Sequence, residues 1–326
     1  MHIHLSPPST ASEFRGDRGR LRSLRRGLML TGLLLAVASD ASAQSTARRS
    51  RTEIEQSLKK IESRFKSGKG DSALREALVA LNQYRYLCGV PPDVELKADY
   101  TELAQAAAEI CALLGNITHT PSNPGLSEDA YRKARDGAGR SNLAVGANLP
   151  GSVHMYMFDS DPSNIDRVGH RRWCINPAMR FTGFGIKERF SAMYSMDGSR
   201  EEVPESDFIA YPPAGLMPAE YFGPRHAWHV SVNLRKYRIE NAAEIKVALL
   251  PLKKGAPAPT PLVPPASALK LDAFHVDLGG MGGGPAIIFR SPDAQPAKGR
   301  RYAVVVYGLK DSEGNAARLS YVTEFF

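Results

Sequence analysis

Apolar side chains recur every three or four residues in the first half of the chain, a spacing that places them on one face of a helix. The first such segment, after a capping-box pattern at 52–55, holds Ile54, Leu58, Ile61 and Phe65. Asp71 can cap the next segment, and Gly115 can end the one after it. We therefore expect helices over about 52–67, 72–88 and 100–114, with shorter helical pieces at 127–135 and 153–158.

The pattern changes to short apolar runs in the second half of the chain. Two short strands are expected at 184–186 and 192–194. Further strands are expected around 228–234, 245–249, 269–271, 286–289, 302–307 and 319–325. Turn residues separate these runs, and the Pro-rich stretch 251–265 is interpreted as a stiff loop between two of them. Several short strands between turns are typical of a β-sandwich, so the fold class is α+β, with a helical domain at 71–200 and an all-β domain at 206–326.

The first 43 residues have the pattern of a secretory signal peptide. Six arginines precede the apolar run 27–37, and Ala41-Ser42-Ala43 is a small-residue cleavage site. The run is too short to span a bilayer, so we expect cleavage after Ala43 and no transmembrane anchor afterwards. The predicted location is outside the cell or in a periplasm, and both the general and the twin-arginine export routes stay open. Residues 44–70 then form a basic linker and the short first helix.

The formal charge of +8 is concentrated near the start of the chain. Residues 1–43 carry a net +3 and Arg48, Arg49 and Arg51 add three more, so only about +2 remains on the globular part. A nucleic-acid partner is therefore not expected, since such proteins carry a clustered basic face. The three cysteines are an odd number, so at least one has no partner within the chain.

Five ordered segments in residues 72–196 resemble the CAP superfamily of cysteine-rich secretory proteins, venom antigens and plant pathogenesis-related proteins. They are ALVALNQYRYLCGVPP, VELKADYTELAQAAAE, ITHTPS, RSNLAVG and GHRRWCINPAMRFTGFGI. The last resembles the histidine segment of bacterial members. The resemblance implies an α-β-α sandwich around a cleft, here followed by an Ig-like or fibronectin-like β-sandwich.

The resemblance also implies a ligand cleft at His119, Ser141, Asn142, Asp159 and His170. His119 and His170 match the family's two cleft histidines, which in some members bind zinc or a similar divalent ion. The family's first acidic position falls on Ser141, where a hydroxyl cannot supply the charge of a carboxylate. Asp159 is a candidate for the second acidic position. No catalytic residue is assigned.

Each of these residues also has a simpler interpretation. Without the resemblance, His119 and His170 are two unrelated surface histidines, since no short-range ligand motif links them. Ser141 lies in no nucleophile elbow, so it is interpreted as part of a loop, and Asn142 as a residue that fixes a backbone turn. The glycine-rich stretch 279–284 lacks the Lys-Ser/Thr of a phosphate loop and is interpreted as a flexible connection.

The sequence thus predicts an exported protein that binds an unknown extracellular or cell-envelope ligand in a histidine-lined cleft, rather than an enzyme. Zinc or another divalent cation at His119 and His170 is the possible cofactor. Two alternatives remain. The first is a metal-dependent hydrolase in which His119, Asp159 and His170 hold the ion. The second is a structural module with an inert cleft.

Overall fold

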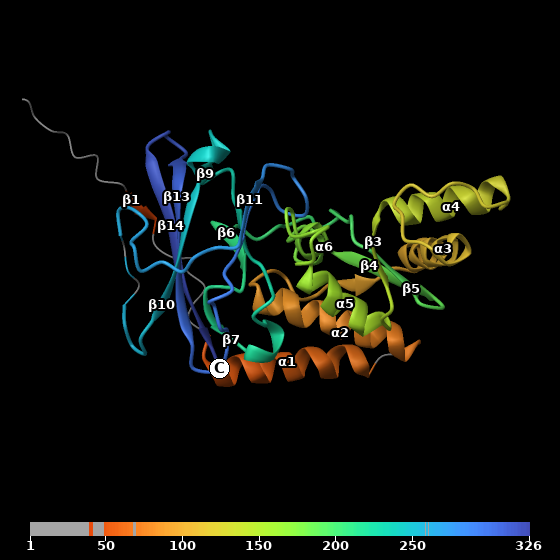
Figure 1. Cartoon of the computed structure of the whole chain (residues 1–326). Coiled ribbons are helices and arrows are strands. Elements are labelled where there is room, and N and C mark those ends of the chain that lie inside the picture. Colours follow the sequence, from red (N-terminus) through yellow and green to blue (C-terminus); the bar gives the residue numbers. More distant parts are fainter. Residues whose placement is uncertain (1–38, 42–48, 68–69, 258, 260) are drawn as a thin grey trace, which may run out of the picture. The chain divides into compact units, whose positions relative to one another are not determined.

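In the computed structural model, the described α-helices all precede residue 175, and most described strands follow residue 206 (Figure 1). The structure describes residues 39–41, 49–67, 70–257, 259 and 261–326. The mixed helix and strand content confirms the predicted α+β class. Among the described residues, no helix has both the length and the apolar character needed to cross a membrane.

The helices are α1 (Arg51–Lys66), α2 (Ser72–Leu87), α3 (Ala98–Leu114), α4 (Glu128–Gly139), α5 (Leu149–Phe158) and α6 (Gly169–Cys174). Asp71 caps α2, and Gly115 ends α3 in the left-handed conformation at φ 66°, as predicted. The expected capping box at Thr52 is wrong. Ser50 caps α1 together with Glu53, because Arg49 donates to the carbonyl oxygens of the last two residues of α2 and fixes the chain two residues before Thr52.

The first sheet has the strand order β2-β4-β5-β3, with β2 (Glu95–Leu96), β3 (Ser141–Val145), β4 (Phe181–Lys187) and β5 (Phe190–Tyr194). Helices cover both of its faces. Phe184 and Met193 pack with α2 and α5, while Ala192 and Tyr194 pack with α3. A Cβ at Gly183 or Gly185 would overlap the backbone of α3, so these two glycines let the helix lie directly on the strand.

The remaining strands form two sheets. One contains β1 (Ser39–Ala41), β14 (Ala316–Phe325), β13 (Arg301–Asp311) and β10 (Lys246–Leu252), with β7 (Gly215–Met217) and β9 (Tyr237–Arg238) paired at its sides. The other has the order β11 (Ala273–Asp277), β12 (Ala286–Arg290), β8 (Trp228–Val232) and β6 (Phe208–Tyr211). Trp228 of β8 contacts Tyr302 of β13 and Phe325 of β14, so the two sheets share one core.

One sequence expectation about this region differs from the structure, and another is not tested by it. Residues 269–271 do not form a strand; Leu269 and Leu271 pack against the core, and β11 begins at Ala273. The predicted signal peptide 1–43 lies outside the described residues except for β1, which pairs with β14 in parallel.

The packing groups residues 38–326 into one unit. The domain boundary near residues 200–206 therefore stays a prediction.

Cys88, Cys111 and Cys174 are all buried and unpaired.

Candidate functional site

His119 and His170 lie next to each other, with ring centroids 6.4 Å apart. His119 belongs to the loop between α3 and α4 and is exposed, whereas His170 is the second residue of α6 and its side chain is 21% exposed. The Nδ1 atom of His119 lies 2.9 Å from the carbonyl oxygen of Ala138 at the end of α4. Because a carbonyl oxygen can only accept, this contact sets the proton on Nδ1 and leaves Nε2 as the acceptor nitrogen.

Asp159 fixes the second histidine in the same way. Its Oδ1 atom lies 2.8 Å from Nδ1 of His170, and its Oδ2 atom accepts from the backbone N–H of Arg171 at 3.2 Å. The carboxylate is 2% exposed, and it ends α5 in the left-handed conformation at φ 38°. The structure therefore places Asp159 on the Nδ1 side of His170, where it orients the imidazole and leaves Nε2 free for a ligand.

Asn142 connects this histidine to the sheet. Its Nδ2 atom donates to the carbonyl oxygen of His170 at 2.9 Å, and its Oδ1 atom accepts from the hydroxyl of Ser195 at 3.1 Å. Its own carbonyl accepts from the hydroxyl of Tyr156 at 3.1 Å, and the Tyr156 ring lies 5.7 Å from that of His170. Tyr156 and Ser195 were not among the expected site residues, although Tyr156 lies on α5 about one helical turn before Asp159.

Ser141 differs from its expected place. It is the first residue of β3 rather than part of a loop, and it is 1% exposed. Neighbouring residues on a strand point to opposite faces. Asn142 points toward α6, so Ser141 shares the face of Leu143, which packs with α3 and α4. Within the described residues, its buried hydroxyl has no hydrogen-bond partner, and no hydrogen bond joins it to either histidine.

The two histidines fit a divalent ion only as a two-nitrogen site. Two imidazoles on one tetrahedral zinc ion, with Zn–N bonds of ~2.0 Å, have ring centroids about 5 Å apart. The observed 6.4 Å therefore requires the rings to approach by at least about 1 Å, and the exposed His119 has the greater freedom to move. Among the described residues, no group of three His, Cys, Asp or Glu side chains gathers around a common point. Water or a ligand would have to complete the coordination.

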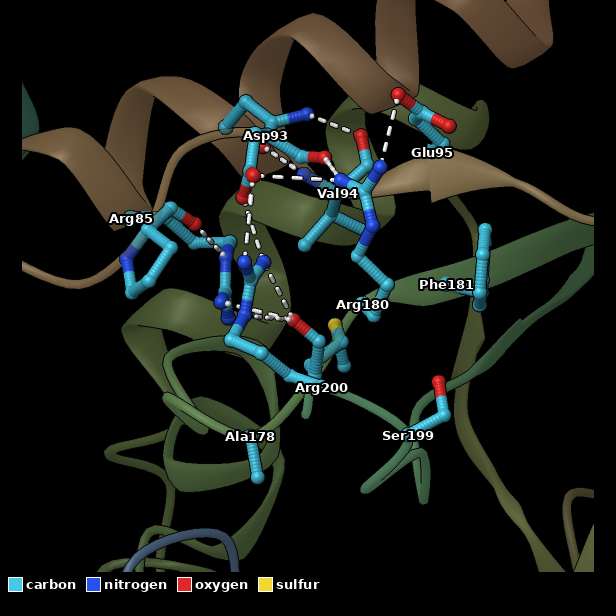
Figure 2. Close-up of polar contacts among 12 residues, drawn as sticks. Arg85, Asp93, Val94, Glu95, Ala178, Arg180, Phe181, Ser199 and Arg200 are labelled. Atoms are coloured by element: carbon cyan, nitrogen blue, oxygen red, sulfur yellow. Dashed lines mark hydrogen bonds and ion pairs between the residues drawn. The ribbon is translucent and has the colours of Figure 1, made fainter. Parts of the chain in front are cut away.

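The chain that follows α6 is held by a buried arginine from α2 (Figure 2). Arg85 is fully buried and donates to the carbonyl oxygens of Pro91, Cys174, Asn176 and Met179 at 2.8–3.3 Å. Burial, helped by the charge of Arg200, lowers the pKa of Arg85 to about 9. Three of these acceptors fix the backbone from the end of α6 to the start of β4, and Pro91 joins it to the chain that follows α2.

Around Arg85, Asp93 lies between the guanidinium groups of Arg180 and Arg200, as Figure 2 shows. The Arg200 contact is 2.5 Å and the Arg180 contact is 3.2 Å. Arg180 also pairs with Glu95 of β2 at 3.3 Å. Every charged group in this cluster has a partner within the chain, so we assign the cluster to the support of the fold.

Two further histidines near α6 have no role in the pair. His226 lies in a loop, accepts from the backbone N–H of Gly223 at 3.0 Å, and has its pKa lowered by burial to about 3. His229 on β8 is fully buried, and neither of its ring nitrogens has a hydrogen-bond partner among the described residues. Burial, together with the charges of Arg171 and Arg172, holds its pKa well below the usual value.

A scan against protein-family models finds no match to this chain, and searches of curated proteins and of solved structures find none either.

Proposed function

We propose that the chain is an exported CAP-like protein that binds a ligand through His119 and His170. The arrangement of the first sheet supports this proposal, since helices cover both of its faces and the rings of the two histidines lie 6.4 Å apart. In this proposal the strands after residue 206 form an Ig-like or fibronectin-like sandwich. The protein acts at the cell envelope or outside the cell, as a binding protein rather than an enzyme.

One observation supports a divalent cation, with zinc as the first candidate. Each histidine has its Nδ1 atom engaged by an oxygen acceptor, Ala138 O for His119 and Asp159 Oδ1 for His170. A histidine that ligates a metal through Nε2 uses its other nitrogen in this way, which fixes the tautomer and raises the basicity of the ligand atom.

The residues of the site then have distinct tasks. His119 and His170 present their Nε2 atoms to the ligand, and Asp159 holds the ring of His170. Asn142 and Tyr156 fix the backbone on either side of that ring. A bound divalent cation would supply a positive centre for an anionic group of the ligand. With only two protein nitrogens, the site is expected to bind zinc at micromolar strength and to exchange it readily.

The test is calorimetric titration of zinc into residues 44–326, with the double variant His119→Ala/His170→Ala beside it. A matched control removes two other histidines, as His154→Ala/His275→Ala. We expect micromolar binding by the wild type and the control, and none by the cleft variant. No binding by the wild type, or equal binding by all three proteins, contradicts the cation proposal and leaves a metal-free cleft or an inert structural module.

A metal-assisted hydrolase is the second candidate, and the buried Asp159–His170 pair is the observation that favours it. A carboxylate that orients an imidazole also makes its Nε2 a stronger ligand atom, and a divalent ion held by the two histidines would lower the pKa of a water molecule bound to it. In this role Asp159 acts through His170 and does not hold the ion. Turnover of peptide and ester libraries by the wild type, lost in Asp159→Asn, would favour this candidate over a binding protein.

A further inference from the structure

The side of α6 away from the cleft is joined to the strands of the second half of the chain. Arg171 is fully buried and donates to the carbonyl oxygens of Met157 at 2.7 Å and Ala227 at 2.6 Å. Its guanidinium carbon lies 5.0 Å from the centre of the Tyr211 ring. This one residue thus ties α6 both to α5 and to the chain that leads into β8.

Arg172 makes the second connection. Its side chain is 1% exposed, and it pairs with the carboxylate of Asp277 at the end of β11. The same guanidinium donates to the carbonyl oxygens of Gly279 and Gly284, both at 2.6 Å, and of Arg167 at 3.1 Å. A buried arginine with a carboxylate and three carbonyl acceptors has little freedom to move.

The glycine-rich loop 279–284 is therefore built around α6. Gly282 is buried at φ 57°, and a Cβ there would overlap the carbonyl oxygen of Arg172. A Cβ at Gly169, the first residue of α6, would lie 2.9 Å from the sulfur of Met281. The loop directs carbonyl oxygens at a cation, which is the opposite of a phosphate loop. Its backbone can approach the helix because every residue of the loop except Met281 is a glycine.

We propose that Asp277 and the loop 279–284 position His170 by holding the helix that carries it, through Arg172. The effect on ligand binding rests on the proposed function, whereas the holding of α6 does not. His170 directly precedes the two arginines on a helix of six residues, so a shift of Arg172 moves the backbone of His170 with it. The second half of the chain then completes the cleft and is more than a spacer.

The test compares two pairs of variants of residues 44–326, the chain that the expected cleavage after Ala43 leaves. Asp277→Asn removes the charge that faces Arg172, and its control is Asp272→Asn, which breaks the Asp272–Arg290 ion pair on the same sheet. Gly282→Ala pushes the loop away from α6, and its control is Gly280→Ala, where a Cβ meets no atom within 4 Å. Two quantities are measured for each protein: amide hydrogen exchange, by peptide, and the Kd for zinc.

We expect Asp277→Asn and Gly282→Ala to raise hydrogen exchange in 169–174 while exchange in β13 stays as in the wild type. The Kd for zinc should rise by about tenfold or more, as for other residues that orient a metal ligand. The controls should change neither quantity. Unchanged exchange in 169–174, or an equal increase in β13, overturns the inference, because a general loss of stability would act on both. If the wild type binds no zinc, the proposed function fails, and the exchange data still decide the inference.

Discussion

Acidification from pH 7.5 to 5.0 should cost the native state about 2 kcal/mol through His229 alone. In the folded protein this side chain is fully buried beside Arg171 and Arg172, and its pKa lies well below the usual value. In the unfolded chain it titrates near 6.5. Below that pH the unfolded state binds a proton that the folded state does not bind, so the free energy of unfolding falls as the pH falls.

The magnitude follows from the interval between the pKa of the histidine in the unfolded chain and the lower assay pH. Each pH unit below the pKa of the histidine in the unfolded chain lowers the free energy of unfolding by up to ~1.4 kcal/mol, until the pH reaches the pKa in the folded protein. The assay pH of 5.0 lies about 1.5 units below the pKa in the unfolded chain. The substitution His229→Leu removes the titrating group and its two unpartnered nitrogens. It should therefore remove about 2 kcal/mol of pH dependence and leave the free energy of unfolding at pH 7.5 equal or higher, since apolar replacement of unpaired buried polar groups is neutral or stabilising.

Urea unfolding at the two pH values measures this difference directly. The matched control is His275→Leu, which changes a half-buried histidine on β11 that faces the same residue of β12, Ile288. Subtraction of the pH effect in the variant from that in the wild type removes the contributions of all other titrating groups. If wild type, variant and control lose equal free energy on acidification, His229 is either protonated or solvated in the native state, and the assignment is wrong.

Two further substitutions test the support of α6 and of the sheet. Arg85→Met leaves four backbone carbonyls without their donor and should lower the free energy of unfolding in urea by about 3–5 kcal/mol, because buried acceptors that lose a charged donor stay desolvated without a partner. A loss below about 1 kcal/mol would show that water replaces the guanidinium. Gly185→Ala should also lower the melting temperature strongly, because the new Cβ overlaps the backbone of α3. The control Gly198→Ala, whose Cβ meets no atom within 4 Å, should not lower it. Equal melting temperatures for the two variants would refute the close approach of α3 to β4.

Local signals in the sequence predicted most of the helices and strands, since caps and apolar spacing act within one element. The cap of α2 and the end of α3 are examples, because a side-chain acceptor and a glycine suffice for each. The start of α1 was less predictable. Ser50 and Thr52 both begin a capping-box pattern, and the contact of Arg49 with α2 decides between them. Tertiary contacts of this kind leave no periodic trace in the sequence.

In the candidate site, too, tertiary contacts decide what local patterns in the sequence cannot predict. The neighbourhood of His119 and His170 depends on the packing of α4 and α6 against β3, so the residue pattern alone could not place them together. Ser141 was expected in a loop because it lies in no nucleophile elbow, yet β3 pairs with β5 there and buries it. The glycine-rich loop was expected to be a flexible connection because it lacks the residues of a phosphate loop. Its partner, Arg172, is more than a hundred residues earlier in the chain, so no local pattern indicates their contact.

The proposed role of the two histidines is tested most directly by long-range ¹H–¹⁵N spectra of the histidine side chains in residues 44–326, recorded at pH 8 with and without zinc. We expect His119 and His170 to carry their protons on Nδ1, and we expect only their Nε2 resonances to move when zinc is added. Protons on Nε2 of both rings, or zinc-dependent shifts at other histidines with these two unchanged, would contradict the account.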